Sequence, residues 1–135
     1  MVVDTSVLLH IAFREEGWQN SLTFLASQPG LSVPASALIE AHAVITGRGG
    51  QNPEGVIDAL LETLNVQVTA INHPEAVLAR HAYTRYGKGR HKASLNFGDV
   101  MSYAVAASRD EPLAFVGEDF SFTDLETVHL PLEGG

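Results

Sequence analysis

The sequence predicts an α/β protein in which a parallel sheet of about four or five strands is flanked by helices. Two observations lead to this prediction. Short apolar segments alternate along the chain with longer segments of helical periodicity, and glycine, proline and polar residues separate them. Strands that alternate with helices pair in parallel, and a parallel sheet is buried on both faces, so helices must cover each side.

The first half of the chain contains two of the predicted strands and four of the helices. Two valines before Asp4 form the end of a buried strand, and Trp18, Leu22 and Leu25 recur at helical spacing. Pro34 suits the first turn of the third helix. We therefore predict strands at 2–3 and 31–33, and helices at 6–13, 17–28, 34–46 and 53–64.

The second half continues the alternation. Residues 66–71 alternate as in a half-buried strand, and residues 113–116 form the strongest strand-like segment of the chain. Between them, the pattern predicts helices at 74–86 and 96–108, joined by a polar, basic loop at 87–94. A last strand is predicted at 127–130.

The composition is that of one globular domain covering residues 1–135. Hydrophobic residues make up 45% of the chain and charged residues 18%, which excludes a disordered chain. The absence of cysteine excludes disulfides, thiolate zinc sites and a cysteine nucleophile. No apolar run approaches the roughly 20 residues of a membrane span. The first residues also lack the pattern of a signal peptide, so we expect a cytoplasmic protein with no membrane partner.

The charges are unevenly distributed. Eight Lys and Arg residues stand against 16 Asp and Glu residues, and the resulting net charge of −8 is a poor overall match to a polyanion. Five of the eight cations nevertheless lie between Arg80 and Lys92. We expect a local basic patch on an acidic protein whose surface could also attract a basic partner.

Four carboxylates are predicted to meet at one edge of the sheet. Asp4 and Asp119 come just after predicted strands, and Glu40 and Asp99 lie early in helices that begin near the same edge. Ligands of open α/β sheets bind at the carboxyl ends of the strands. A site made of carboxylates, without cysteine or paired histidine ligands, suits Mg²⁺ or Mn²⁺. An ion held in this way keeps coordination positions open for water and phosphate oxygens. The pattern indicates metal-assisted hydrolysis of a phosphodiester.

Each acid also has a simpler structural interpretation. Asp4 could cap the helix that follows it, and Asn96 with Asp99 has the spacing of a capping box. Glu40 could pair with an arginine at the edge of an apolar helix, and Asp119 could be a solvated loop residue. If the four acids do converge, their repulsion should raise carboxyl pKa values and leave the metal-free site loose.

Four motifs resemble those of PIN-domain ribonucleases, and most closely those of the VapC toxins of bacterial toxin–antitoxin pairs. The motifs are Val2-Val3-Asp4-Thr5-Ser6, the helix of Glu40, Leu95-Asn96-Phe97-Gly98-Asp99, and Phe115-Val116-Gly117-Glu118-Asp119-Phe120 with Thr123-Asp124. They span nearly the whole chain in fitting order. The resemblance implies a PIN-like three-layer sandwich and a Mg²⁺-dependent endoribonuclease, with Mn²⁺ as an alternative metal. It also implies an RNA substrate, commonly tRNA or rRNA, a homodimer and a cognate antitoxin protein.

The resemblance also assigns roles to individual residues. Asp4, Glu40, Asp99 and Asp119 match the acidic catalytic and metal-binding quartet. The chemistry of carboxylates around a metal suggests how these four divide the work: Asp4 and Asp99 are the expected metal ligands, Glu40 would bind the metal or act as general base, and Asp119 would act through water or at a second metal. Supporting roles fall to Thr5 or Ser6, near the metal or the scissile phosphate, and to Asp124 as an outer acid.

Three basic residues of the 87–94 loop are expected to contact RNA as a group. They are Lys88, Arg90 and Lys92, whose charges could neutralise RNA phosphates.

Other phosphate-handling folds match the sequence poorly. A phosphatase of the haloacid-dehalogenase type requires a second aspartate where this chain has Ser6, and a receiver domain requires an acid after the third strand, where none follows. The alternative that stays open is a catalytically silent PIN-fold module that acts only by binding protein.

Overall fold

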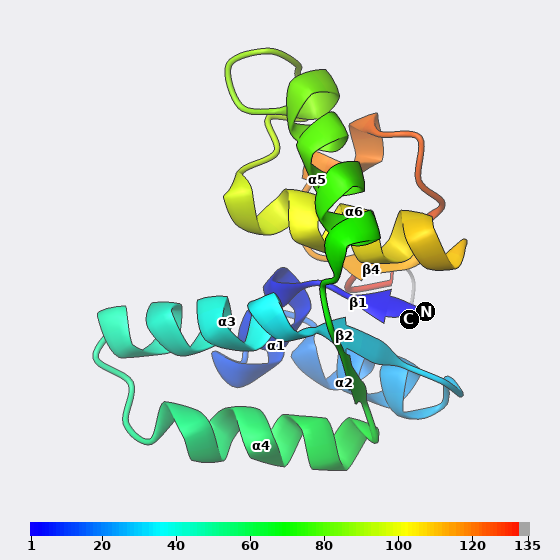
Figure 1. The fold of residues 1–135 in the computed structure, drawn as a ribbon. Helices are drawn as coiled ribbons and strands as arrows, with labels where there is room; N and C mark the ends of the chain where they lie inside the picture. Colours follow the sequence, from blue (N-terminus) through cyan, green and yellow to red (C-terminus); the bar gives the residue numbers. More distant parts are fainter. Residues whose placement is uncertain (133–135) are drawn as a thin grey trace.

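The computed structural model describes residues 1–132, which contain five strands, six α-helices and one 3₁₀ turn (Figure 1). The strands are β1 (Val2–Val3), β2 (Ser32–Pro34), β3 (Gln67–Thr69), β4 (Leu113–Phe115) and β5 (Thr127–His129). The helices are α1 (Thr5–Ala12), α2 (Trp18–Ala26), α3 (Ala35–Gly47), α4 (Pro53–Leu64), α5 (His73–Tyr86) and α6 (Phe97–Arg109), and η1 (Asp119–Phe122) is the 3₁₀ turn.

The strands form one parallel sheet between two layers of helices. Their order is β3-β2-β1-β4-β5, and each neighbouring pair is parallel. Adjacent residues of a strand face opposite sides. Val3 and Ala114 pack into the core with residues of α1 to α4, whereas Val2 and Phe115 pack into the core with residues of α5 and α6 (Figure 1). The predicted parallel sheet with flanking helices is confirmed.

The sheet has a topological switch point between β1 and β4. From β1 the chain adds β2 and then β3 on one side, and it later returns to the other side of β1 to add β4 and β5. In parallel sheets such a reversal opens a crevice at the carboxyl ends of the two central strands. Asp4 directly follows β1, and Asp119 begins the 3₁₀ turn that follows β4.

The observed elements differ from the predicted ones at two places. Pro34 is the last residue of β2 rather than a residue of the helix, because its ψ of 141° is extended and it occupies the N-cap position of α3. The turn η1 was not predicted, since residues 119–122 have no periodicity that distinguishes a single 3₁₀ turn from a loop. The other elements agree with the predicted ranges to within about two residues at most ends.

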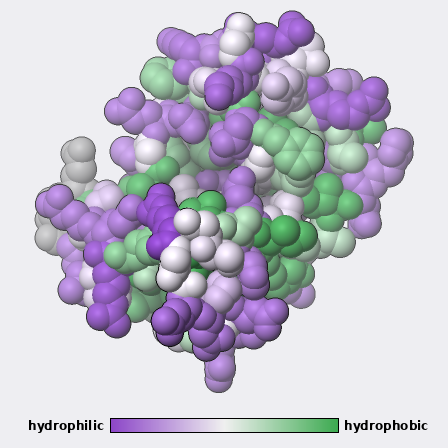
Figure 2. All heavy atoms as spheres, turned by 90° about the vertical axis from the view of Figure 1, so that its left-hand side faces the viewer, coloured by the Kyte–Doolittle hydropathy of each residue, from purple (hydrophilic) through white to green (hydrophobic). Residues whose placement is uncertain are grey.

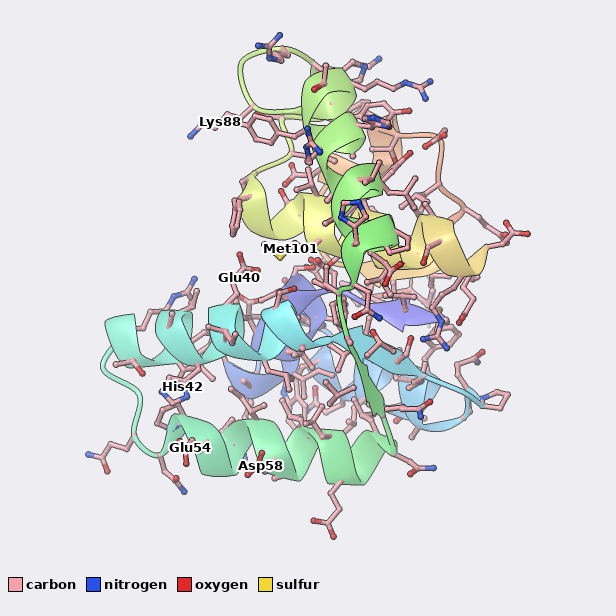
Figure 3. The ribbon with its side chains drawn as sticks, viewed as in Figure 1. Glu40, His42, Glu54, Asp58, Lys88 and Met101 are labelled. Atoms are coloured by element: carbon pink, nitrogen blue, oxygen red, sulfur yellow. The ribbon has the colours of Figure 1, made fainter. Side chains whose placement is uncertain are left out.

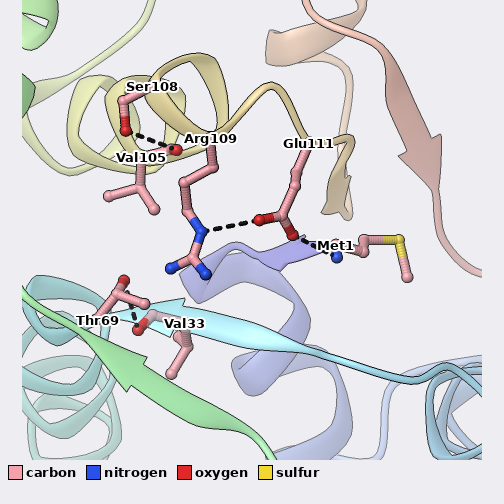
Figure 4. Close-up of polar contacts among 7 residues, drawn as sticks. All are labelled: Met1, Val33, Thr69, Val105, Ser108, Arg109 and Glu111. Carbon is pink, nitrogen blue, oxygen red and sulfur yellow. Dashed lines mark hydrogen bonds and ion pairs between the residues drawn. The ribbon is translucent and has the colours of Figure 1, made fainter.

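Polar contacts fix the opposite, amino-terminal edge of the sheet. The amino group of Met1 donates to Oε1 of Glu111 at 2.8 Å, and Nε of Arg109 donates to Oε2 of Glu111 at 2.8 Å (Figure 4). The hydrogen bond from the terminal amino group is the main reason why the pKa of Glu111 is lowered. These contacts join the end of α6 to the start of β1. No helix within residues 1–132 combines the length and the hydropathy that a membrane span requires.

Candidate metal centre

Asp4 is held rigidly at the end of the central strand. Its backbone N–H donates to the carbonyl of Ala114 at 3.0 Å, which continues the pairing of β1 with β4. Its carboxylate accepts from the N–H of Ser6 at 3.0 Å and caps α1, and the residue is only 3% exposed. The predicted capping role is therefore real, but it uses only one carboxylate oxygen. The other oxygen remains available at the crevice.

The two residues after Asp4 join α1 to the neighbouring strand. The hydroxyl of Ser6 accepts from the N–H of Val116 at 3.0 Å, just beyond the end of β4. Because a hydroxyl that accepts one hydrogen bond can still donate its own hydrogen, Ser6 retains a donor at the crevice. Thr5 is buried at the first position of α1. Both residues lie where a supporting role was expected.

Glu40 lies on the side of α3 that faces α6, whereas His42 lies on the side that faces α4 (Figure 3). Its carboxylate packs against the first turn of α6, next to Gly98: a Cβ built on Gly98 would lie 2.0 Å from Oε2 of Glu40. The alternative of an arginine partner for Glu40 is not observed, because no ion pair to Glu40 exists within residues 1–132. The structure thus brings Glu40 to the helix turn that carries Asp99.

Asp99 combines a structural bond with an unfavourable electrostatic environment. Its N–H donates to Oδ1 of Asn96 at 2.9 Å, and its Oδ2 accepts from the N–H of Asn96 at 3.0 Å, so the predicted capping box is present. Burial raises the pKa of Asp99 to about 7, against the backbone hydrogen bond from Asn96, which lowers it. The negative charges of Asp4, Asp119 and Glu40 raise the pKa further. The other three predicted acids therefore lie near enough to influence Asp99.

Asp119, in the loop after β4, is the last of the four predicted acids. It is exposed, and burial is still the largest cause that raises its pKa, followed by the charges of Asp4 and Glu118. The pKa values of Asp99 and Asp119 are both raised, as the sequence predicted for converging acids, but burial is the larger cause and repulsion between the acids adds to it. Within residues 1–132, however, no three acidic or histidine side chains are already arranged to enclose a metal ion.

The donor set fits a hard divalent cation. Asp4, Glu40, Asp99 and Asp119 offer only carboxylate oxygens, which Mg²⁺ and Mn²⁺ prefer over softer ligands. A cation here would offset the neighbouring negative charges, which add to the effect of burial in raising the pKa of Asp99. The residue types therefore match the chemistry of the predicted ion.

Asp124 joins α5 and α6 to the segment that follows η1. Its Oδ1 accepts from the hydroxyl of Tyr103 on α6 at 2.5 Å, and its Oδ2 lies 3.7 Å from the guanidinium of Arg85 on α5. Burial and the hydrogen bond to Asp124 raise the pKa of the Tyr103 hydroxyl. Asp124 thereby anchors the segment that carries Asp119. Tyr103 and Arg85 could not be identified as partners from the sequence, because Asp124 is distant from both in the chain and no local pattern indicates the contact.

The basic loop is closed by backbone hydrogen bonds. The N–H of Lys88 donates to the carbonyl of Leu95 at 2.9 Å, and the N–H of Leu95 donates to the carbonyl of Tyr86 at 2.9 Å. Lys88, Arg90 and Lys92 are all exposed, and Nζ of Lys92 lies 4.9 Å from the centre of the Phe122 ring. The loop therefore presents three cations from a defined backbone.

An apolar groove lies beside the carboxylates. It has a volume of about 620 Å³ between α5 and the start of α6, and Arg80 and Lys88 also line it. Phe97, one of the residues that line it, has 76% of its surface exposed. Figure 2 shows this face hollowed between polar regions, with hydrophobic residues along the hollow. The apolar residues that line the groove include Ile71, Ala79, Tyr83, Phe97, Val100 and Met101.

Fold and site together define an α/β protein with a carboxylate cluster at the switch point of a parallel sheet. The family model of the PIN domain matches residues 1–125. The chain is 39% identical over 129 residues to "Ribonuclease VapC" of Mycolicibacterium smegmatis, an alignment that covers 96% of this chain and 100% of the relative. The chain therefore belongs to the PIN-domain family, in its VapC ribonuclease branch.

Further relatives and solved structures agree with this assignment. "Ribonuclease VapC30" of Mycobacterium tuberculosis is 37% identical over 131 residues, covering 97% of this chain and 100% of the relative. The crystal structure of VapC20 of M. tuberculosis, described as a Sarcin-Ricin loop cleaving toxin, superposes with a TM-score of 0.73 at 19% identity. That alignment covers 92% of this chain and 95% of VapC20. A toxin–antitoxin complex from Klebsiella pneumoniae gives a TM-score of 0.69 at 16% identity, covering 94% of each chain. The predicted family and fold are confirmed.

Proposed function

We propose that this chain is a divalent-metal-dependent endoribonuclease and the toxin of a toxin–antitoxin pair. The observation that carries the proposal is the convergence of Asp4, Glu40 and Asp119 on Asp99 at the switch point of the sheet. The curated relatives, which are named VapC ribonucleases, support the same activity. The proposed substrate is a tRNA or rRNA, on which the protein would act in the cytoplasm.

The four carboxylates would divide the chemistry between them. Asp4 and Asp99 would hold Mg²⁺, or Mn²⁺ in its place, since each has one oxygen fixed by a capping hydrogen bond and one left over. A cation bound there would lower the pKa of a bound water and offset charge on the phosphate. Glu40 would either complete the ligand set or take the proton of the attacking water. Asp119, at the exposed rim, would act through water or at a second metal.

Cleavage of total RNA by the purified protein tests this proposal. We expect fragments in Mg²⁺ or Mn²⁺, none in EDTA, and none from Asp4→Asn in any condition. The chain length of the fragments would identify the RNA that is cut. Cleavage that persists in EDTA would contradict the proposal. If the Asp4→Asn variant remained toxic to cells, this result would instead favour the alternative that the chain is a catalytically silent binding module.

The basic loop is proposed to bind RNA phosphates next to the site. Replacing Lys88, Arg90 and Lys92 together with alanine should flatten the salt dependence of RNA binding. Three phosphate contacts on a single strand correspond to a change of about 2 in the slope of log K against log salt. Titration of a noncleaving Asp4→Asn background with labelled RNA at several salt concentrations measures the slope. An unchanged slope would exclude the loop from binding.

We propose that the apolar groove is where a second copy of the chain packs to form a homodimer. The groove is lined mainly by apolar side chains, and the most exposed of these is Phe97 at 76%; exposed apolar surface of this kind is typical of protein interfaces. Because Phe97 and Val100 line the groove from the helix turns that carry Asp99, pairing through it would bring the two copies of α6 close together. Sedimentation of the wild type and of Phe97→Ser measures this: a dimer that becomes a monomer supports the proposal, and a monomeric wild type contradicts it.

The partner protein is proposed to be a cognate antitoxin. Solved structures with this fold are described as VapBC and toxin–antitoxin complexes, which supports such a partner. An acidic crevice suits an inhibitor that inserts an arginine or displaces the metal. A structure of the complex with the crevice open and metal-loaded would contradict that mode of inhibition.

A further inference from the structure

Gly98 lies in direct contact with the carboxylate of Glu40. A Cβ built at this position would lie 2.0 Å from Oε2, 2.7 Å from Cδ and 2.8 Å from Oε1 of Glu40. Any side chain at position 98 would therefore overlap the carboxylate. Gly98 is the second residue of α6, where the backbone is helical and accessible to every residue type. The space that Glu40 occupies, and not the backbone conformation, is what requires glycine here.

We propose that Gly98 is a positioning residue: by lacking a side chain, it forms the seat in which the Glu40 carboxylate is held beside Asp99. The inference rests on the proposed metal-dependent function, which it deepens. In the same turn of α6, the capping box with Asn96 fixes one oxygen of Asp99. A single helical turn therefore places two carboxylates that come from different helices. Within residues 1–132 the Glu40 carboxylate forms no ion pair, and its close packing against Gly98 is the contact that defines its position.

The geometry separates the effect on the site from the effect on folding. The atoms that a new Cβ would meet are the far end of a flexible side chain, which can rotate away at little cost. Alanine also has a higher helix propensity than glycine, so the substitution is favourable for the first turn of α6. Gly98→Ala should therefore fold normally, while the Glu40 carboxylate is forced out of its seat and away from Asp99.

Comparison of Gly98→Ala with a matched glycine variant tests the seat. Gly47 lies at the end of α3, the helix of Glu40, and a Cβ built there meets nothing within 4 Å. We expect Gly98→Ala to weaken Mn²⁺ binding, measured by calorimetry, by about tenfold or more and to slow RNA cleavage similarly, as losses of supporting residues around metals do. Gly47→Ala should leave both quantities unchanged, and both variants should melt at or above the wild-type temperature.

A double variant shows whether Gly98 acts through Glu40. In a Glu40→Gln background the carboxylate is already absent, so Gly98→Ala should weaken Mn²⁺ binding little further; independent effects would instead multiply. Wild-type Mn²⁺ binding together with an unaffected Gly98→Ala variant would overturn this inference alone. A wild-type chain that binds no Mn²⁺ and cuts no RNA would overturn the proposed function and the seat with it.

Discussion

Asp99→Asn is expected to abolish RNA cleavage and yet to stabilise the metal-free protein. An amide is isosteric with the carboxylate, and its oxygen can still accept from the N–H of Asn96, so the capping box survives. The substitution removes the charge that a cation would bind, and loss of a metal ligand should lower cleavage by at least about 100-fold. It also removes the ionised group that burial and three neighbouring acids disfavour.

The sign of the stability change follows from the pKa of about 7 in the folded protein, well above the value of 3.8 for an unperturbed aspartate. A carboxyl group with a raised folded-state pKa stabilises the protein fully below its unfolded pKa, and this contribution is lost as the pH rises through 7. At pH 8 and without metal, Asp99→Asn should gain about 1–2 kcal/mol, a figure reduced for the solvent that reaches this half-buried group. The gain should shrink as the pH falls toward 5.

Thermal unfolding in EDTA at several pH values measures the effect, and Asp110→Asn provides the matched control. Asp110 caps the opposite end of the same helix in a left-handed conformation that asparagine also adopts readily. The Asp110→Asn variant should change neither RNA cleavage nor the pH dependence of unfolding. Retained cleavage by Asp99→Asn, or a melting temperature below that of the wild type at pH 8, would contradict the assignment of Asp99 to the metal centre.

Metal affinity is expected to fall steeply below neutral pH. A cation binds ionised Asp99, so protons compete for the site below its pKa of about 7. One competing proton lowers the apparent affinity by nearly tenfold per pH unit well below the pKa; because Asp99 is already half protonated at pH 7, the loss between pH 7 and pH 5 is about 50-fold. Above pH 7 the affinity should level off. The raised pKa of Asp119 adds to the loss at the acidic end.

Mn²⁺ titration monitored by electron paramagnetic resonance measures this dependence without RNA. The Asp110→Asn variant should reproduce the wild-type curve, because it lies at the far end of α6. An affinity that stays constant from pH 5 to pH 8 would show that no carboxylate with a raised pKa takes part in binding.

The local interpretations of Asp4 and Asp99 turned out to be compatible with a place in the cluster. Asp4 caps α1 and Asp99 forms a capping box, as their spacing in the sequence indicated, and each uses one oxygen for that bond. A carboxylate has two oxygens, so a cap can hold a side chain still while its other oxygen faces the crevice. Sequence spacing alone could not distinguish these roles, since it describes only the nearest neighbours along the chain.

The sequence by itself determined the alternation of strands and helices, the family, and which acids follow the strands, because periodicity, caps and motifs are local properties. Tertiary structure decided what those residues meet. The switch in strand order brings Asp4 and Asp119 to one crevice, and the packing of α3 against α6 sets Glu40 on Gly98. It also joins Asp124 to Tyr103 and Arg85. Such contacts connect residues far apart in the chain, and their geometry arises only when the layers pack.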